Sequence, residues 1–484
     1  MDMRPNKAIA ITREELTRSA HDLTAGATRN ARNLRESLRV FVLCILVAIL
    51  MGVAGWAFLT ALNIATETRE AHLWLFFLLP VVNVVTAWLY RNHGLRAQRG
   101  NNLVIDSTLG GSPIHRRMAA LTFVCSTATH LAGGSAGREG AAVQIGGTIA
   151  STVSSLFHMT GHDRRDIMMA GISSAFGAAF GTPLAGAFFG MEMCFIGKLD
   201  YSAALYCLTG SMVGNFVSRA LGSTFVFQPI GVVPSMQPQT LALVVLAAIV
   251  FGATARLFTF CVHTVKSFYA RFFTNYLLAA AVSGIVLVVL FLGCGLHEYG
   301  GLSEWLVPDA FRGNTTLLDP LAKLGMTALT VGAGFQGGEV TPLFGIGASL
   351  GGWIGSATLG EPDFMAALGM LGVFGSALNV PITTIMLGID MFGGTAGAYF
   401  VIVAFVSYLV AGHHAVYPAQ RIVTPKRRSL KTDANLSVGE AREQRHAAET
   451  ANEQPATVAE EAVEQMDAGV DDNAEQVNAD KDKS

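Results

Sequence analysis

Apolar residues along the chain fall into two kinds of segment, long runs and short runs divided by glycine. The long runs occupy residues 37–65, 72–90, 201–221, 241–273, 275–292 and 396–411. A helix needs roughly 20 apolar residues to cross the hydrocarbon core of a bilayer. These runs therefore predict membrane helices, and the chain as a whole predicts a multi-pass, all-α integral membrane protein.

The divided runs lie in two regions, residues 100–193 and 317–391. Helices that stop inside a protein leave backbone N–H groups unpaired at their N-termini. Those groups and the helix dipole favour an anion, and non-helical backbone at membrane depth is tolerated where it lines a cavity. Interruptions that occur in corresponding halves of a chain indicate a transporter's binding site.

The two divided regions also resemble each other in sequence. Three glycines and a glutamate recur 200 residues apart, in the pairs Gly134/Gly334, Gly137/Gly337, Glu139/Glu339 and Gly147/Gly347. Further along, the Phe-Gly-x-Ala pattern of residues 176–179 recurs 198 residues later at 374–377, and Glu192 recurs as Asp390. A separation that drifts by only two residues favours duplication over chance similarity. We therefore predict two repeat halves, residues 37–221 and 239–424.

Composition and charge agree with a membrane location. Of the 484 residues, 51% are hydrophobic and 14% are charged, whereas soluble domains are typically about 25% charged. The net charge of −2 gives no indication of a nucleic-acid partner.

Basic residues gather beside the predicted helices. Eight lie in the first forty residues, and others follow the second and the last run, at Arg91, Arg96, Arg99, Lys426, Arg427 and Arg428. Because cytoplasmic loops carry such an excess, we expect a plasma-membrane protein of the bacterial inner-membrane type with both termini cytoplasmic. Residues 1–36 would be a basic arm and 37–424 the transport domain. The last sixty residues, 425–484, hold fourteen acidic residues and predict a tail that is disordered or loosely helical.

The strongest motif is Gly-Gly-Ser-Ala-Gly-Arg-Glu-Gly at residues 133–140. In it Glu139 opens an apolar helix, and a carboxylate buried in a membrane is costly unless it has a function. The flanking Gly137 and Gly140 favour a side chain that enters and leaves a narrow path. An alternative is that Glu139 only stabilises the helix dipole. We predict that it is the gate of an anion path.

The Gly-Arg-Glu-Gly sequence, followed by x-x-Val-Gln, resembles the CLC family of chloride channels and proton-coupled anion antiporters. The resemblance covers residues 37–424. It implies a bundle of two inverted repeats, a homodimer with one pore per subunit, and a glutamate at position 139 that competes with the anion and carries the coupled proton. It also implies that Tyr417 coordinates the anion, and that the path is lined by the backbone of Gly137, Arg138, Gly140, Gly338 and Val340.

Three departures from the chloride-selective pattern resemble the fluoride/proton antiporter branch of that family. Gly100-Asn101-Asn102 stands where chloride-selective members read Gly-Ser-Gly-Ile-Pro, and Ala141 replaces a proline. Glu339-Val340-Thr341 stands in the second-repeat motif that otherwise reads Gly-x-Phe-x-Pro. The closing segment at residues 412–417 is similar to that branch as well.

The expected anion site therefore consists of Asn101, Asn102, Glu339, Thr341 and Tyr417. Fluoride has a high charge density, so its lost hydration must be replaced by strong donors such as an amide, a hydroxyl or a phenol. Glu339 cannot donate unless it is protonated. Our hypothesis is that it is neutral for part of the cycle and orients Thr341 or accepts the ion; the alternative is a helix cap.

The proton route has one unusual feature. By the resemblance, the second proton glutamate of chloride/proton exchangers falls on Met193, which leaves Glu139 and Glu339 as the buried candidates. Glu192 and Asp390, which match across the repeats, are interpreted as structural or interfacial residues at helix ends.

The predicted function is fluoride export in exchange for protons, with fluoride or chloride, protons and membrane lipid as partners. A chloride/proton antiporter or chloride channel of the same fold is the alternative. An intramembrane hydrolase is a remote one, since the sequence has no Gly-x-Ser-x-Gly or His-Glu-x-x-His motif. No cofactor is expected. A metal site is not expected either, because the adjacent His413 and His414 would point about 100° apart on a helix.

Overall fold

The chain folds as a bundle of helices in the computed structural model, which describes residues 6–445 and residue 447. The first half contains α1 (Asn6–Ala71), α2 (Leu79–His93), α3 (Asn101–Thr108), α4 (Arg117–Leu131), α5 (Glu139–Leu156), α6 (Gly161–Phe180), α7 (Pro183–Glu192) and α8 (Ala204–Ala220). The second half contains α9 (Pro238–Phe272), α10 (Tyr276–Val288), α11 (Leu306–Phe311), α12 (Leu318–Gly332), α13 (Val340–Thr358), α14 (Pro362–Leu378), α15 (Pro381–Phe392) and α16 (Gly397–Ala411). Two short parallel strands, β1 (Phe195–Ile196) and β2 (Arg421–Ile422), are the only strands among the residues that the structure describes. The predicted all-α class is confirmed.

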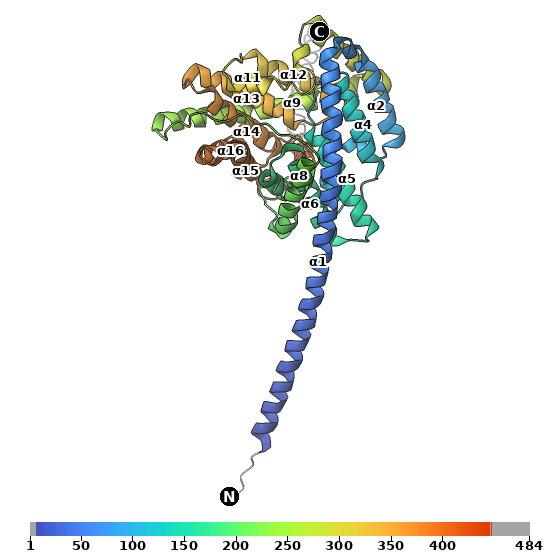
Figure 1. The fold of residues 1–484 in the computed structure, drawn as a ribbon, viewed down its shortest axis with the longest axis vertical. Helices are drawn as coiled ribbons and strands as arrows, with labels where there is room; N and C mark the ends of the chain where they lie inside the picture. Colours follow the sequence, from blue (N-terminus) through green and yellow to red (C-terminus); the bar gives the residue numbers. More distant parts are fainter. Residues whose placement is uncertain (1–5, 446, 448–484) are drawn as a thin grey trace, which may run out of the picture.

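Four helical segments among the described residues are long and apolar enough to cross a membrane, namely Leu34–Ala71, Leu73–His93, Pro238–Phe272 and Tyr276–Gly293. They coincide with four of the predicted spans. Most of the other helices are shorter, as expected for helices that end inside the protein. Figure 1 shows α1 along one side of the bundle, with its N-terminal part extending well beyond the other helices. The segment predicted as a basic arm is therefore helical from Asn6 and continuous with the first membrane helix.

The two halves share one order of helices, and their register is set by backbone pairing. Gly137 and Gly338 exchange two hydrogen bonds, with N···O distances of 2.5 and 2.6 Å, in an antiparallel bridge. Such a reciprocal pair is what a local two-fold relation between inverted repeats produces. Helices α4 and α12, α5 and α13, and α6 and α14 each begin 201 residues apart.

This register corrects one sequence-based expectation. Because α5 begins at Glu139 and α13 begins at Val340, the structural counterpart of Glu139 is Val340, and Glu339 corresponds to Arg138. The predicted equivalence of Glu139 and Glu339 is wrong by one residue. Successive residues of a helix point about 100° apart, so the two glutamates face different surroundings.

Glu192 and Asp390 hold the two repeats together. The Glu192 carboxylate accepts backbone N–H groups of Ile382 and Thr383 at the start of α15, at 3.1 and 2.8 Å. Asp390 in turn accepts the N–H of Ala185 at the start of α7, at 2.9 Å. Each carboxylate thus satisfies free donors at the helix N-terminus of the other repeat. Their interpretation as structural residues at helix ends is confirmed.

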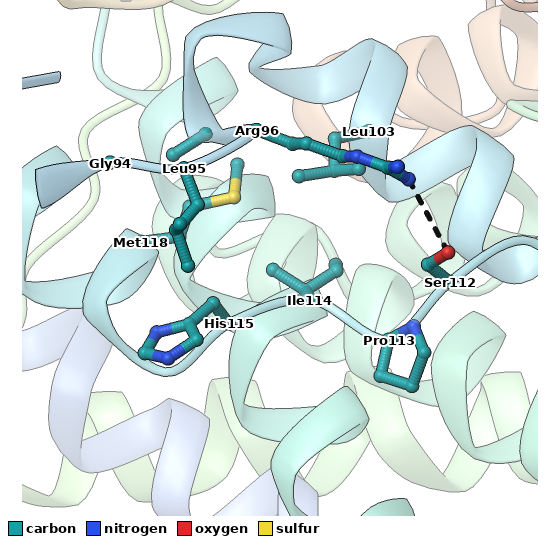
Figure 2. Close-up of a pocket in the computed structure, with 10 residues that line it drawn as sticks. Gly94, Leu95, Arg96, Leu103, Ser112, Pro113, Ile114, His115 and Met118 are labelled. Carbon is teal, nitrogen blue, oxygen red and sulfur yellow. Dashed lines mark hydrogen bonds between the residues drawn. The ribbon is translucent and has the colours of Figure 1, made fainter. Parts of the chain in front are cut away.

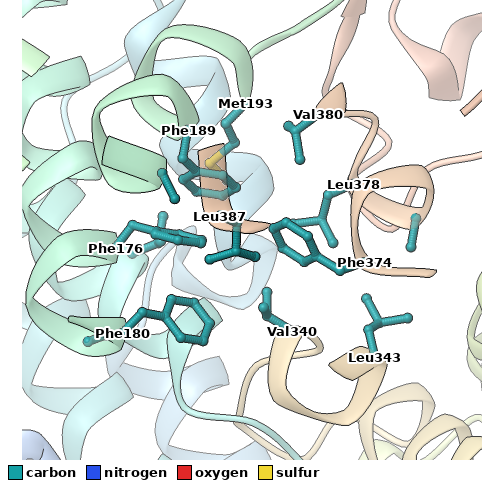
Figure 3. Close-up of a cluster of buried hydrophobic side chains, with 14 of the residues drawn as sticks. Phe176, Phe180, Phe189, Met193, Val340, Leu343, Phe374, Leu378, Val380 and Leu387 are labelled. Carbon is teal, nitrogen blue, oxygen red and sulfur yellow. The ribbon is translucent and has the colours of Figure 1, made fainter. Parts of the chain in front are cut away.

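The core lies where the repeats meet (Figure 3). There Phe176 of α6 packs on Phe189 of α7 and on Phe374 of α14, with ring centroids 4.5 and 6.3 Å apart. Met193 is fully buried in the same cluster. The side chain at the position where the exchanger glutamate would fall therefore packs among apolar groups.

The ordered part of the chain extends further beyond α16 than the sequence predicted. Ile422 and Val438 pack with Ile196 and Tyr408, and the His413 Nδ1 atom lies 2.6 Å from Asp433 Oδ2. The disordered alternative is therefore wrong for residues 425–445, because apolar side chains and the buried His413–Asp433 hydrogen bond hold them on the bundle. Apart from residue 447, the rest of the predicted tail lies outside the described residues.

The Gly137–Gly338 bridge leads to a first prediction. A Cβ atom at Gly338 would lie 2.5 Å from the Gly140 nitrogen, so Gly338→Ala must displace backbone. We expect it to lower the free energy of unfolding by about 1–3 kcal/mol, measured as a lower thermal midpoint of the purified protein in detergent. Gly325→Ala is the control, since nothing lies within 4 Å of its Cβ position in α12. That variant should gain about 0.5–1 kcal/mol, and equal midpoints for the two variants would contradict the prediction.

Candidate functional site

Glu139 is buried at the first position of α5, and its carboxylate reaches across to the second repeat. Its Oε2 atom accepts the Thr341 hydroxyl at 2.5 Å and the Thr341 backbone N–H at 3.2 Å. Arg138 adds a backbone N–H at 3.2 Å, and its Nε lies 3.1 Å from Oε1. The Thr341 N–H is one of the donors that α13 cannot satisfy within its own first turn. The carboxylate therefore occupies a place that suits an anion.

A second polar cluster lies beside the first and comes from three distant parts of the chain. The Asn101 Nδ2 atom donates to the Tyr417 hydroxyl at 3.1 Å, and that hydroxyl donates to Glu339 Oε2 at 3.3 Å. Asn101 begins α3, Glu339 precedes α13, and Tyr417 follows α16. The structure thus brings together three of the five predicted anion-site residues. We refer to Asn101, Glu339 and Tyr417 as the inner cluster.

Gly140 separates Glu139 from the inner cluster. A Cβ atom at this position would lie 2.8 Å from the Gly338 Cα, 3.1 Å from Asn101 Nδ2 and 3.3 Å from Glu339 Oε2. A side chain here would collide with backbone and crowd the polar atoms on both sides. Because Gly140 has no side chain, the Gly338 backbone and the polar atoms of Asn101 and Glu339 can lie close to the start of α5.

The inner cluster lines a cavity of about 650 Å³, which we call the vestibule. Basic side chains lie on its wall, at Arg91, Arg99, Lys266 and Arg442. Together they outweigh the carboxylate of Glu339 on the same wall, and a hollow in which positive charge predominates attracts anions. The vestibule can therefore collect anions and present them to Asn101, Glu339 and Tyr417. Sequence analysis did not single out Lys266 and Arg442, because only the fold brings α9 and the C-terminal segment to this wall.

The remaining predicted site residues have other partners. Asn102 accepts the backbone N–H of Ala419 at 3.0 Å, so it holds the segment that follows Tyr417. The Thr341 hydroxyl binds Glu139 rather than Glu339. The expectation that Glu339 orients Thr341 is therefore not met in this conformation. The Val340 side chain is buried in the core (Figure 3), so only its backbone could face the path.

A separate pocket of about 480 Å³ lies between the end of α2 and the start of α4. Figure 2 shows Leu95, Leu103, Ile114 and Met118 around it, with Arg96 bonded to Ser112 at 3.4 Å. None of the predicted site residues lines this pocket. Across the residues that the structure describes, no group of His, Cys, Asp and Glu side chains could hold a metal ion.

Comparison with known proteins gives consistent similarities. The chain matches the protein family described as voltage gated chloride channel over residues 82–412. It is 36% identical over 424 residues to a chloride/fluoride channel protein of Pseudomonas syringae pv. tomato, which covers 86% of this chain and 93% of that protein. It is 26% identical to the H+/Cl− exchange transporter ClcA of Vibrio cholerae, over 73% of this chain and 81% of the transporter. Among solved structures, a CLC-type fluoride/proton antiporter superposes with a TM-score of 0.77 at 32% identity, covering 80% of this chain and 98% of that one.

Proposed function

This chain belongs to the voltage gated chloride channel family, the CLC family, and we propose that it is an antiporter that exports fluoride in exchange for protons. The observation that carries the proposal is the Glu139 carboxylate on the Thr341 hydroxyl and N–H group. These are the donors that a fluoride ion needs, and a titratable carboxylate now occupies them.

Competition between Glu139 and the anion would couple the two fluxes. When ionised, the carboxylate accepts the Thr341 donors and fills the site as an anion does. Protonation removes its charge and weakens these charge-assisted hydrogen bonds. The side chain can then leave with its proton, and an anion can take its place. Each exchange thus moves an anion in one direction and a proton in the other.

Fluoride as the substrate is supported by the donors and by the relatives. Both the chloride/fluoride channel protein and the fluoride/proton antiporter exceed 30% identity. Thr341, Asn101 and Tyr417 provide hydroxyl, amide and phenol donors along one path. A small anion with a large hydration cost favours such strong donors. A chloride-carrying antiporter of the same fold remains the competing function.

The direction of export rests on charge placement. Arg91, Arg96 and Arg99 lie near the end of α2 that is close to the vestibule, and an excess of such residues marks cytoplasmic loops. We propose that the vestibule opens to the cytoplasm, that both termini are cytoplasmic, and that the protein is a homodimer with one path per subunit. Hydrogen fluoride that crosses the membrane undissociated ionises inside the cell, and the vestibule would collect the fluoride.

Flux from liposomes tests the function. We expect purified protein in fluoride-loaded liposomes to release fluoride with a matching uptake of protons, and an imposed proton gradient to drive fluoride uphill. Chloride-loaded liposomes are the comparison, with fluoride and proton electrodes as the readout. Equal chloride flux, or fluoride flux without proton uptake, would contradict the proposal.

A further inference from the structure

Gln144 lies on the wall of the vestibule, one helical turn after Gly140 on α5. Residues four apart on a helix face the same side, and Gly140 faces Asn101 and Glu339. The Gln144 Nε2 atom lies 3.3 Å from the position that a Cβ of Gly100 would occupy. Because Gly100 directly precedes Asn101, the Gln144 amide faces the start of α3 beside the inner cluster.

Two hydroxyl groups lie at the oxygen end of this amide, so its nitrogen end faces the vestibule. Thr122 Oγ1 donates to Gln144 Oε1 at 3.0 Å, and the Tyr90 hydroxyl lies 3.2 Å from Thr122 Oγ1. Since Thr122 has one hydroxyl proton, which it gives to Gln144, Tyr90 is the donor to Thr122. Oε1 is held at Thr122, and the two N–H donors of Nε2 remain on the vestibule side. In the part of the chain that the structure describes, Nε2 has no hydrogen-bond acceptor.

We propose that Gln144 is a further anion-binding residue, which donates through Nε2 to the ion as it passes from the vestibule to the inner cluster. Thr122 and Tyr90 are the positioning residues that orient its amide. This inference rests on the proposed function, because it concerns the anion path of the same transporter.

The chemistry of an amide suits this position. An anion that leaves the vestibule loses water, and each lost hydrogen bond must be replaced. A neutral N–H donor to an anion forms a charge-assisted hydrogen bond. Unlike Arg91 or Lys266 on the same wall, the amide brings no full charge that would retain the ion. Gly100 has no side chain between this donor and α3, so the ion can contact Gln144 and Asn101 in succession.

Two buried threonines of α4 provide a matched test. Thr122 and Thr129 are both fully buried, but Thr129 Oγ1 donates to the Cys125 carbonyl of its own helix at 2.9 Å. Thr122→Val removes the hydrogen bond that holds the Gln144 amide. Thr129→Val makes the same chemical change at a hydroxyl that bonds to Cys125 and not to Gln144. In liposomes of the full-length protein, we expect Thr122→Val to raise the fluoride concentration for half-maximal flux roughly tenfold, the effect of one hydrogen bond to a charged group. Thr129→Val should leave it unchanged.

Two further variants and two further measured quantities separate binding from a merely structural effect. Gln144→Leu should raise the half-saturating fluoride concentration by at least as much as Thr122→Val, and Thr122→Ser should restore the wild-type value. The maximal flux and the proton-to-fluoride ratio should stay unchanged in each variant, because Glu139 is untouched.

The outcomes distinguish this inference from the proposed function. A wild-type protein without coupled fluoride flux overturns the proposed function. Wild-type flux together with an unchanged half-saturating concentration in Gln144→Leu overturns this inference alone. Equal shifts in Thr122→Val and Thr129→Val would also overturn it, since they would indicate a general effect of disturbing α4.

Discussion

The Glu139→Gln variant is expected to lose proton transport and to leave any remaining fluoride movement passive. Glutamine has nearly the same shape and can still accept from the Thr341 hydroxyl, which now binds at 2.5 Å. It cannot take up and release a proton. Removing a group that transfers protons typically costs a factor of about 100–10,000, so we expect fluoride-driven proton uptake to fall at least about 100-fold.

The measurement is uphill transport in liposomes. A proton gradient is imposed across membranes that contain equal fluoride on both sides, and fluoride accumulation is followed with an electrode. Wild-type protein should accumulate fluoride, and Glu139→Gln should not. Uphill accumulation by this variant would show that another group carries the proton.

Glu192→Gln is the matched control for a buried glutamate. Glu192 is also buried at a helix end, but its carboxylate accepts the backbone N–H groups of Ile382 and Thr383. Its replacement should lower thermal stability, because hydrogen bonds from a charged acceptor are lost. Coupling should survive, since this side chain binds neither Thr341 nor the inner cluster. Loss of coupling in both variants would point to a general disturbance.

Sequence patterns predicted the helices and singled out the buried Glu139 because these features depend on local information. A long apolar run is sufficient for a membrane helix, and Glu139 stands out as a carboxylate that opens one. The same reasoning could not predict the partners of Thr341 or Asn102. Those contacts join residues about 200 and 300 positions apart in the chain, and only the packing of the repeats creates them.

The register of the repeats illustrates the limit of sequence matching. Identical residues favoured an offset of 200, because Glu139 and Glu339 are both glutamates among glycines. Backbone pairing of Gly137 with Gly338 instead gives 201. Packing agrees, since a Cβ at Gly146 would meet the Gly171 carbonyl and one at Gly347 the Gly369 carbonyl. One residue of register moves Glu339 from the position that corresponds to Glu139 to the inner cluster, which changes what the side chain can do.

The inner cluster therefore gives the second prediction, that Glu339→Gln impairs both fluoride flux and coupling. The Glu339 carboxylate accepts the Tyr417 hydroxyl at 3.3 Å and lines the vestibule, whereas its side chain makes no capping hydrogen bond to α13. Glutamine can still accept from Tyr417, so the position of the tyrosine should be preserved. What is lost is the ability to change charge beside Gly140, which lies between Glu139 and the inner cluster on the proposed path of the anion and the proton.

We expect Glu339→Gln to lower maximal fluoride flux by at least roughly tenfold, since a hydrogen bond to a charged group is worth about 1.4 kcal/mol more than one to a neutral group. We also expect it to reduce the proton-to-fluoride ratio. Tyr417→Phe is the companion variant, because it removes the hydroxyl that joins Asn101 to Glu339 but leaves the carboxylate. It should raise the half-saturating fluoride concentration and keep the ratio. If Glu339→Gln retained both the flux and the ratio, Glu339 would have no part in the cycle, and the proton would have to pass Gly140 with Glu139 alone.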